Sequence, residues 1–192
     1  MTSKIKIIIV QPQGLGDTIM ITPLLRSIKK SYNNCIVRII VSSEASKSVL
    51  DGSLLVDEVV VFNRRKEGFV NHIKLLMDNY NFSPDVFYMS PYTNKYYGQL
   101  FSFLSGASIR IGNDKTIPVL GFTHSNPAFD GKHQVDANIN LFSLGLSLTS
   151  QIRQPYFHLT CEEIAIGKNF FIDNKLQKKL VIGMHFGGDS QN

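Results

Sequence analysis

A glycine-containing turn near the N-terminus holds the residues with the clearest potential for chemistry. It places Gly14, Gly16 and Asp17 directly after a short apolar run and directly before an amphipathic segment. Glycines can take positive φ and bring bare backbone close to a ligand, and a helix that begins there presents unpaired N–H groups to an anion. Asp17 has two interpretations: an acid that stabilises the helix end, or a general base at a sheet edge. Spacing alone leaves both open and favours the first.

A second chemical candidate is the run of three cations at Arg64, Arg65 and Lys66. Arginine binds phosphate or carboxylate through two parallel hydrogen bonds, and lysine adds a point charge. The run follows a predicted strand, so topology puts it at the same sheet edge as Asp17. A charge run is by default a solvated surface feature, and this position makes anion binding an equal alternative.

Other kinds of catalytic site have weaker support. The two glycines match part of a dinucleotide-binding G-x-G-x-x-G pattern, but Ile19 occupies the third glycine position and Asp17 would face the pyrophosphate. The five histidines are scattered, the serines lack a nucleophile-elbow motif, and Cys35 and Cys161 lie far apart without metal-ligand spacing. We therefore predict no metal site and no serine hydrolase. A nicotinamide oxidoreductase has weak support, because the glycine pattern is incomplete.

The composition is that of a globular protein. Of the 192 residues, 43% are hydrophobic and 18% are charged, which argues against disorder. The net charge of +5 suits an anionic ligand and is too small to predict a nucleic-acid partner. No apolar run approaches the length of a membrane span, and two separated cysteines fit a reducing compartment. We expect a cytoplasmic protein with no transmembrane segment.

These candidates need a sheet to position them, and the sequence alternates between strand and helix patterns. β-branched and apolar runs predict strands at residues 5–10, 36–41, 56–62, 85–89 and 108–111. Helical spacing predicts helices at residues 18–30, 44–50, 69–80, 96–104 and 135–148. In residues 69–80, one helix face carries Phe69, Ile73, Leu76 and Met77. The expected fold is α/β, a Rossmann-like, doubly wound parallel sheet.

A second domain is predicted to begin near the C-terminus. We assign residues 1–150 to the first domain, 151–160 to a linker and 161–192 to the beginning of the second. Thr160 and Glu163 have the spacing of a capping box, which opens a helix toward residue 179. Residues 180–184 are a predicted strand, and a second glycine turn follows it at Gly187 and Gly188.

The string QGLGDTIMITPLLRSIKKSY resembles the opening of the family 9 glycosyltransferases, the heptosyltransferases of lipopolysaccharide assembly. Four further strings resemble later parts of that family in the same order: VDEVVVF, SPDVFYMSPYTNKYYGQLFSFLSGASIRIG, HQVDANINLFSLGL and VIGMHFGGDS. Several ordered matches are more specific than one glycine loop. Pro12 and Gln13 stand where the family often has a basic residue before the glycine turn.

The resemblance implies a two-domain GT-B architecture. This chain would supply the N-terminal, acceptor-binding half and the start of a truncated donor-binding domain, and would be inactive alone. The implied reaction is the inverting transfer of a heptose from an ADP-sugar, without a metal ion or other cofactor, with Asp17 as the catalytic base. The implied substrate-binding residues are Gly14, Leu15, Gly16, Thr18, Arg64, Arg65 and Lys66. The implied donor-binding residues are Gly187, Gly188 and Ser190.

The partners implied by the resemblance are a nucleotide-sugar donor and an anionic, lipid-linked saccharide acceptor. Such an acceptor places the protein in the cytoplasm, with peripheral contact at the cytoplasmic face of the inner membrane. Two alternatives from other classes remain open. One is a non-catalytic module that binds anions or glycans, and the other is a dinucleotide-binding oxidoreductase domain.

Overall fold

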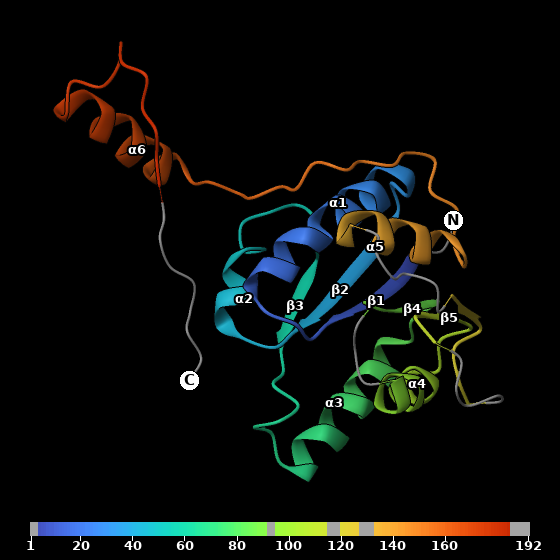
Figure 1. The fold of residues 1–192 in the computed structure, drawn as a ribbon. Coiled ribbons are helices and arrows are strands. Elements are labelled where there is room, and N and C mark those ends of the chain that lie inside the picture. The colour runs from blue at the N-terminus through green and yellow to red at the C-terminus, as the bar shows by residue number, and fades with distance from the viewer. Residues whose placement is uncertain (1–3, 92–94, 115–119, 127–132, 185–192) are drawn as a thin grey trace. The chain divides into compact units, whose positions relative to one another are not determined.

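The computed structural model describes residues 4–91, 95–114, 120–126 and 133–184. The chain divides into two compact units, residues 1–158 and 159–192. The first is built on a six-stranded parallel sheet in the order β3-β2-β1-β4-β5-β6, with helices on both faces, as Figure 1 shows. This confirms the predicted doubly wound, Rossmann-like sheet.

The strands are β1 (Ile5–Gln11), β2 (Cys35–Val41), β3 (Glu58–Val61), β4 (Val86–Met89), β5 (Ile109–Gly112) and β6 (His124–Ser125). The helices of this unit are α1 (Leu15–Ser31), α2 (Glu44–Ser48), α3 (Phe69–Phe82), α4 (Lys95–Leu104) and α5 (Gln134–Ser143).

The central strand β1 is apolar on both sides because each side is covered by helices. Ile7 and Ile9 belong to the core on the side of α1 and α5, whereas Ile8 and Val10 belong to the core on the side of α3 and α4. Successive side chains of a strand point to opposite faces, so an unbroken β-branched run fills both cores.

A buried polar pair lies in the core beneath α1 and α5. The Tyr88 hydroxyl donates to Asn138 Oδ1 at 2.7 Å, and both residues are completely buried. Burial raises the pKa of the Tyr88 hydroxyl well above its ordinary value, so it remains a donor at neutral pH. The pair joins β4 to α5 and fixes the helix over the sheet.

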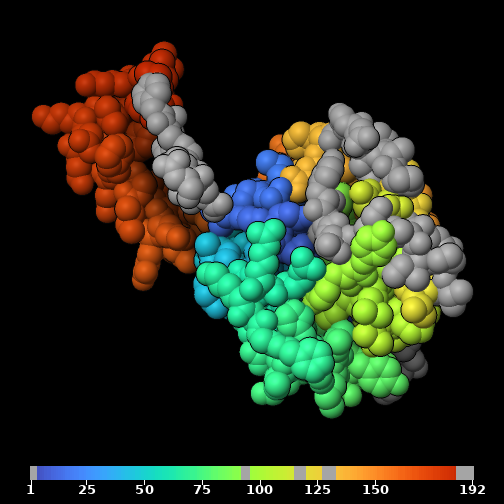
Figure 2. All heavy atoms as spheres, turned by 60° about the horizontal axis from the view of Figure 1, so that its bottom comes forward, coloured from blue at the N-terminus to red at the C-terminus, as the bar shows by residue number. Residues whose placement is uncertain are grey.

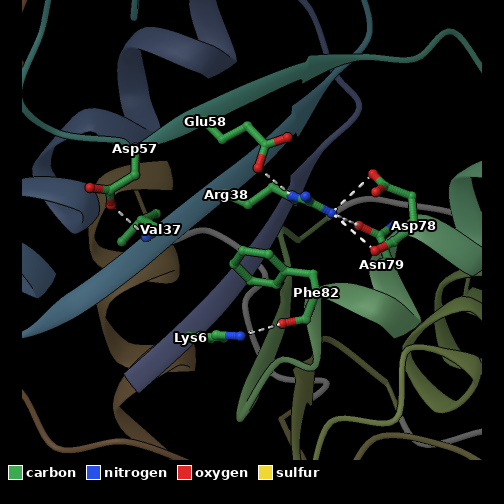
Figure 3. Close-up of polar contacts among 8 residues, drawn as sticks. All are labelled: Lys6, Val37, Arg38, Asp57, Glu58, Asp78, Asn79 and Phe82. Atoms are coloured by element: carbon green, nitrogen blue, oxygen red, sulfur yellow. Dashed lines mark hydrogen bonds and ion pairs between the residues drawn. The ribbon is translucent and has the colours of Figure 1, made fainter. Parts of the chain in front are cut away.

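A buried arginine joins three elements on the other face (Figure 3). Arg38 of β2 donates through Nε to Glu58 of β3 at 2.8 Å and through Nη1 to Asp78 Oδ2 of α3 at 3.1 Å. Its guanidinium also lies 4.3 Å from the ring centroid of Phe82. These contacts let a cation occupy the middle of an apolar strand, because Nε and Nη1 both meet acceptors.

Helix α3 has the predicted apolar face, of which Leu76 is partly buried against the core and the other three residues are exposed. Phe69 is 79% exposed, Ile73 is 40% exposed and Met77 is 61% exposed. The helix packs on the sheet through the buried Leu75 and Asn79, with Leu76 beside them. The spacing predicted which residues share a face. It could not show that Leu75 and Asn79, beside that face, are the residues buried against the sheet.

One further helix of this unit ends before the predicted residue. The helix expected over residues 135–148 ends at Ser143. The chain then passes close to β5 at Gly145, where an added Cβ would lie 2.7 Å from Ile111, so the position requires glycine. The segment 151–156 runs along α1, where the Ile152 amide donates to Ser27 Oγ at 2.9 Å. Its role as an interdomain linker stays a prediction.

The second unit contains the helix α6 (Cys161–Asp173). Its predicted capping box is formed: Thr160 Oγ1 accepts from the Glu163 amide at 3.2 Å, and the Glu163 carboxylate accepts from the Thr160 amide at 2.7 Å. The helix ends at Asp173, six residues before the predicted end. Residues 180–184 do not form the predicted strand, since a strand requires a hydrogen-bonded neighbour and the described residues of this unit supply none.

Candidate functional site

The loop between β1 and α1 leaves an open surface at the carboxyl edge of the sheet. Gly14 is the residue before the helix, with φ −75° and ψ −170°, and neither Gly14 nor Gly16 has positive φ. The expected use of positive φ is therefore wrong at both positions. The backbone at both glycines is instead open to its surroundings, because a Cβ added at either one would meet nothing within 4 Å. Bare backbone at the start of a helix is thus accessible to a ligand.

Asp17 lies in the first turn of α1, where its charge complements the helix dipole. Its side chain is half-buried, and among the described residues none makes a hydrogen bond or ion pair with the carboxylate. Leu15 is 47% exposed in the same turn, whereas Thr18 is completely buried and donates its hydroxyl to the Gly14 carbonyl at 3.1 Å. Thr18 thus shapes the turn, and its contact with a substrate stays a prediction.

Gln13 ties this loop to the neighbouring strand. Its Nε2 donates to the Pro91 carbonyl at 2.6 Å, and its Oε1 accepts from Gln11 Nε2 at 2.6 Å and from Ser90 Oγ at 2.8 Å. The backbone carbonyl of Gln13 also accepts from Ser42 Oγ at 3.1 Å. The first glycine of the loop is therefore held between the ends of β1, β2 and β4.

Replacing Gln13 with alanine is expected to lower the free energy of unfolding by about 2 kcal/mol, because buried donors on Gln11 and Ser90 lose an acceptor. Urea unfolding followed by circular dichroism measures the change. Gln151 is an exposed residue of the same type, and Gln151→Ala should shift stability by less than about 0.5 kcal/mol. Equal effects of the two substitutions would show that the Gln13 contacts do not hold the loop.

A pocket of about 410 Å³ opens beside this loop. Its residues come from the ends of β1, β2 and β4, the loops that follow β1 and β2, the turn after β3, and the helices α3 and α4. The lining is Val10, Pro12, Gln13, Ile40, Val41, Ser42, Phe62, Asn63, Arg64, Arg65, Leu75, Met89, Tyr97 and Phe101. The pocket is mostly apolar with polar groups at one side, which is the usual form of a small-molecule site.

The cationic side of the pocket is a turn built by Asn63. Its Oδ1 accepts from the Arg65 amide at 3.1 Å, and its carbonyl accepts from the Lys66 amide at 2.9 Å. Arg64 lies over the Tyr97 ring, with 4.7 Å between the guanidinium carbon and the ring centroid. An asparagine-initiated turn and an aromatic support thus preorganise the two arginines.

Tyr97 forms the wall opposite the strand ends. Its ring stacks on Phe101 at 5.6 Å between centroids and with 13° between planes. Burial raises the pKa of the Tyr97 hydroxyl, and the nearby Arg64 charge offsets part of that increase. The hydroxyl therefore stays protonated at neutral pH beside a permanent cation.

The structure brings some predicted site residues together and leaves others apart. Arg64 and Arg65 line the pocket, while Asp17 and Lys66 are not part of its lining. Gly187, Gly188 and Ser190 lie outside the described residues, so their donor-binding role stays a prediction. Sequence reasoning did not select Gln13 or Ser42; the available signal was their position directly after predicted strands.

Metal sites and membrane-spanning helices are absent from the described part of the chain. Those residues contain no group of three or more histidine, cysteine, aspartate or glutamate side chains arranged to hold a metal ion. Within the same residues, each helix is too short or too polar to cross a bilayer.

No protein-family model and no curated protein matches the sequence. Solved structures do match. A family 9 glycosyl transferase from Veillonella parvula DSM 2008 superposes over 92% of this chain with a TM-score of 0.69 and 17% identity. The chain has the fold of half a family 9 glycosyltransferase. The match covers 51% of the Veillonella chain, so the sheet corresponds to one Rossmann-like half of a GT-B enzyme.

Two Escherichia coli heptosyltransferases share this GT-B half. The ADP-heptose lipopolysaccharide heptosyltransferase II aligns with 87% of the chain at a TM-score of 0.60 and 17% identity. Heptosyltransferase WaaC, solved with ADP, aligns with 78% at a TM-score of 0.56 and 16% identity. The chain spans about half the length of each, since 50% of each is covered.

Proposed function

We propose that this chain is the acceptor-binding half of a family 9 glycosyltransferase that moves a heptose from an ADP-sugar to an anionic, lipid-linked core saccharide of lipopolysaccharide. The observation that carries the proposal is the arginine-lined pocket at the carboxyl edge of the sheet, the edge where open α/β folds hold ligands. The fold shared with half of three glycosyltransferases supports the reaction class.

In this proposal, Arg64 and Arg65 hold a phosphate or carboxylate of the acceptor. Both line the pocket, and the planar guanidinium group forms paired hydrogen bonds with either anion. Lys66 adds charge from the same turn. Tyr97 lies beneath Arg64 and keeps its guanidinium at the pocket.

Asp17 serves as the general base. The acceptor hydroxyl attacks the anomeric carbon, its proton passes to the Asp17 carboxylate, and the bond from that carbon to the diphosphate breaks with ADP taking the electron pair. One displacement inverts the configuration. The open backbone at Gly14 and Gly16 leaves room for this approach, and among the described residues none makes an ion pair with the carboxylate.

The remaining parts of the proposal concern the whole enzyme. The donor diphosphate is held by Gly187, Gly188 and Ser190, and no metal ion or cofactor takes part. We expect the 192 residues alone to bind acceptor without turnover, because the matched enzymes are about twice this length. The site of action is the cytoplasmic face of the inner membrane, where a lipid-linked acceptor is accessible.

Calorimetric titration tests this proposal. The chain is titrated with a deacylated, water-soluble acceptor saccharide that carries phosphate and Kdo. We expect binding by the native chain and roughly tenfold weaker binding by Arg64→Ala, since a charge-assisted hydrogen bond contributes about 1.5–3 kcal/mol. Arg153→Ala is the matched control, because Arg153 forms an exposed ion pair with Asp136 and does not line the pocket.

Separate titrations with an ADP-sugar and with NADH complete the test. Binding of NADH to the native chain without acceptor binding would overturn the proposal in favour of a dinucleotide-binding domain. Acceptor binding that Arg64→Ala leaves unchanged would remove the basic turn from the acceptor site. If a longer chain that includes the donor half binds both substrates without turnover, the protein is a binding module.

A further inference from the structure

The outer face of α3 and α4 carries an unusual concentration of large apolar side chains. On α3 they recur at the spacing of one helix face, and α4 contributes two more. They are Phe69, Ile73, Met77, Tyr80, Leu100 and Leu104, and each is at least 40% exposed. We name these six residues the outer apolar patch. Figure 2 brings this face forward and shows the green side chains of α3 beside the yellow-green ones of α4.

The patch surrounds a groove rather than a flat surface. A cavity of about 330 Å³ lies between the helices, with Phe69 and Leu76 on one side and Leu100 and Leu104 on the other. It shares Tyr97 with the arginine-lined pocket. Contiguous exposed apolar surface of this kind marks a contact with another molecule.

Cations border the patch. Arg64, Arg65 and Lys66 lie directly before α3, and Lys74 is exposed one residue after Ile73. Two acids lie close in sequence. Glu67 lines the groove and accepts a hydrogen bond from Asn71 at 2.7 Å, and Asp78, next to Met77, is paired with Arg38. The start of α3 adds partial positive charge, since Gly68 offers no side chain to cap its N–H groups.

The geometry points to an anionic bilayer surface as the partner of the outer apolar patch. Apolar and aromatic side chains enter the boundary between headgroups and acyl chains, while neighbouring lysines and arginines meet anionic headgroups. An apolar protein partner would not require the cation border. The link to catalysis rests on the function proposed above: a lipid-linked acceptor would reach Arg64 with its lipid part still in the bilayer.

Vesicle flotation tests the inference without any saccharide. The chain is mixed with vesicles of phosphatidylcholine alone or of phosphatidylcholine with phosphatidylglycerol. We expect about tenfold stronger binding to the anionic vesicles, weakened by 0.5 M salt as exposed charges are screened. The double variant Phe69→Ser with Met77→Ser should bind roughly tenfold more weakly, and Lys74→Glu about fivefold more weakly.

Two controls use apolar residues that are equally exposed outside the patch. Leu54 is 92% exposed in the first unit, and Ile166 is 69% exposed in α6. Leu54→Ser and Ile166→Ser should bind vesicles like the native chain. Loss of binding in Ile166→Ser alone would assign membrane contact to α6 and overturn the inference, as would equal binding to both vesicle types.

Sedimentation of the native chain in the absence of vesicles tests the other possible partner of the patch, a second copy of the chain. A dimer that the double variant dissociates, without vesicle binding, would make the patch a contact between two copies and reject the membrane. Failure of the acceptor titration would leave these results untouched, because that titration uses a deacylated saccharide and these use only lipid.

Discussion

Replacing Arg38 with alanine is expected to lower the free energy of unfolding by about 3 kcal/mol. The Arg38 side chain is 8% exposed, and its loss leaves the buried Asn79 amide oxygen without the donor that lies 3.2 Å away. It also removes the guanidinium from the Phe82 ring and leaves a cavity between sheet and helix. Breaking a buried pair costs about 3–5 kcal/mol. Glu58 and Asp78 are half-exposed and regain water, which places this case at the lower end.

Urea unfolding of purified variants measures the effect of Arg38→Ala. Arg153→Ala is the matched control, since that arginine is 61% exposed in its ion pair with Asp136 and should change stability by less than about 1 kcal/mol. Arg38→Met keeps most of the apolar volume, so it should lose less than the alanine variant if packing dominates. A loss below about 1 kcal/mol for Arg38→Ala would show that the three elements are held together by other contacts.

The second large effect is expected on catalysis. In a longer chain that includes the donor half, Asp17→Asn should lower kcat by about a thousandfold with little change in KM for the acceptor, because the amide cannot take the hydroxyl proton. The measurement is the rate at which ADP is released from the ADP-sugar donor during turnover. The magnitude follows from the usual contribution of a positioned base, which is about 10²–10⁴-fold.

Asp136 provides the control for Asp17, because it is also an aspartate in the first turn of a helix. Asp136→Asn should leave kcat unchanged. The competing interpretation of Asp17, a charge at the helix end, predicts a stability loss of roughly 0.5 kcal/mol with kcat unchanged. Unaltered transfer by Asp17→Asn would therefore assign the residue to the helix dipole.

Local rules predicted most elements of the sheet domain. The β-branched run in β1 indicated burial on both faces, and the structure confirms two separate cores. Helix α2 begins at Glu44, as the sequence predicted, and Ser43 caps it by accepting from the Ser46 amide at 3.2 Å. These features depend on residues close together in the chain, so their signals are contained in short windows.

Features that depend on distant residues were not predictable in the same way. Arg38 interrupts an apolar run, which marks it as unusual, but Glu58 and Asp78 lie 20 and 40 residues away. Topology placed the basic turn at the sheet edge, and the structure adds that Tyr97 supports Arg64. Which line of α3 meets the core depends on the sheet beneath it, and periodicity carries no information about that surface.

The unequal attachment of the helices implies unequal motion. Helix α1 buries eight residues, whereas α3 buries Leu75 and Asn79. Segments with few buried contacts open locally at low free energy while the central strands exchange only on global unfolding. Leu75 of α3 lines the arginine pocket, so the side that receives ligand belongs to the part of the domain that opens first. The pocket can therefore widen for acceptors of different size without disturbing the loop that carries Asp17.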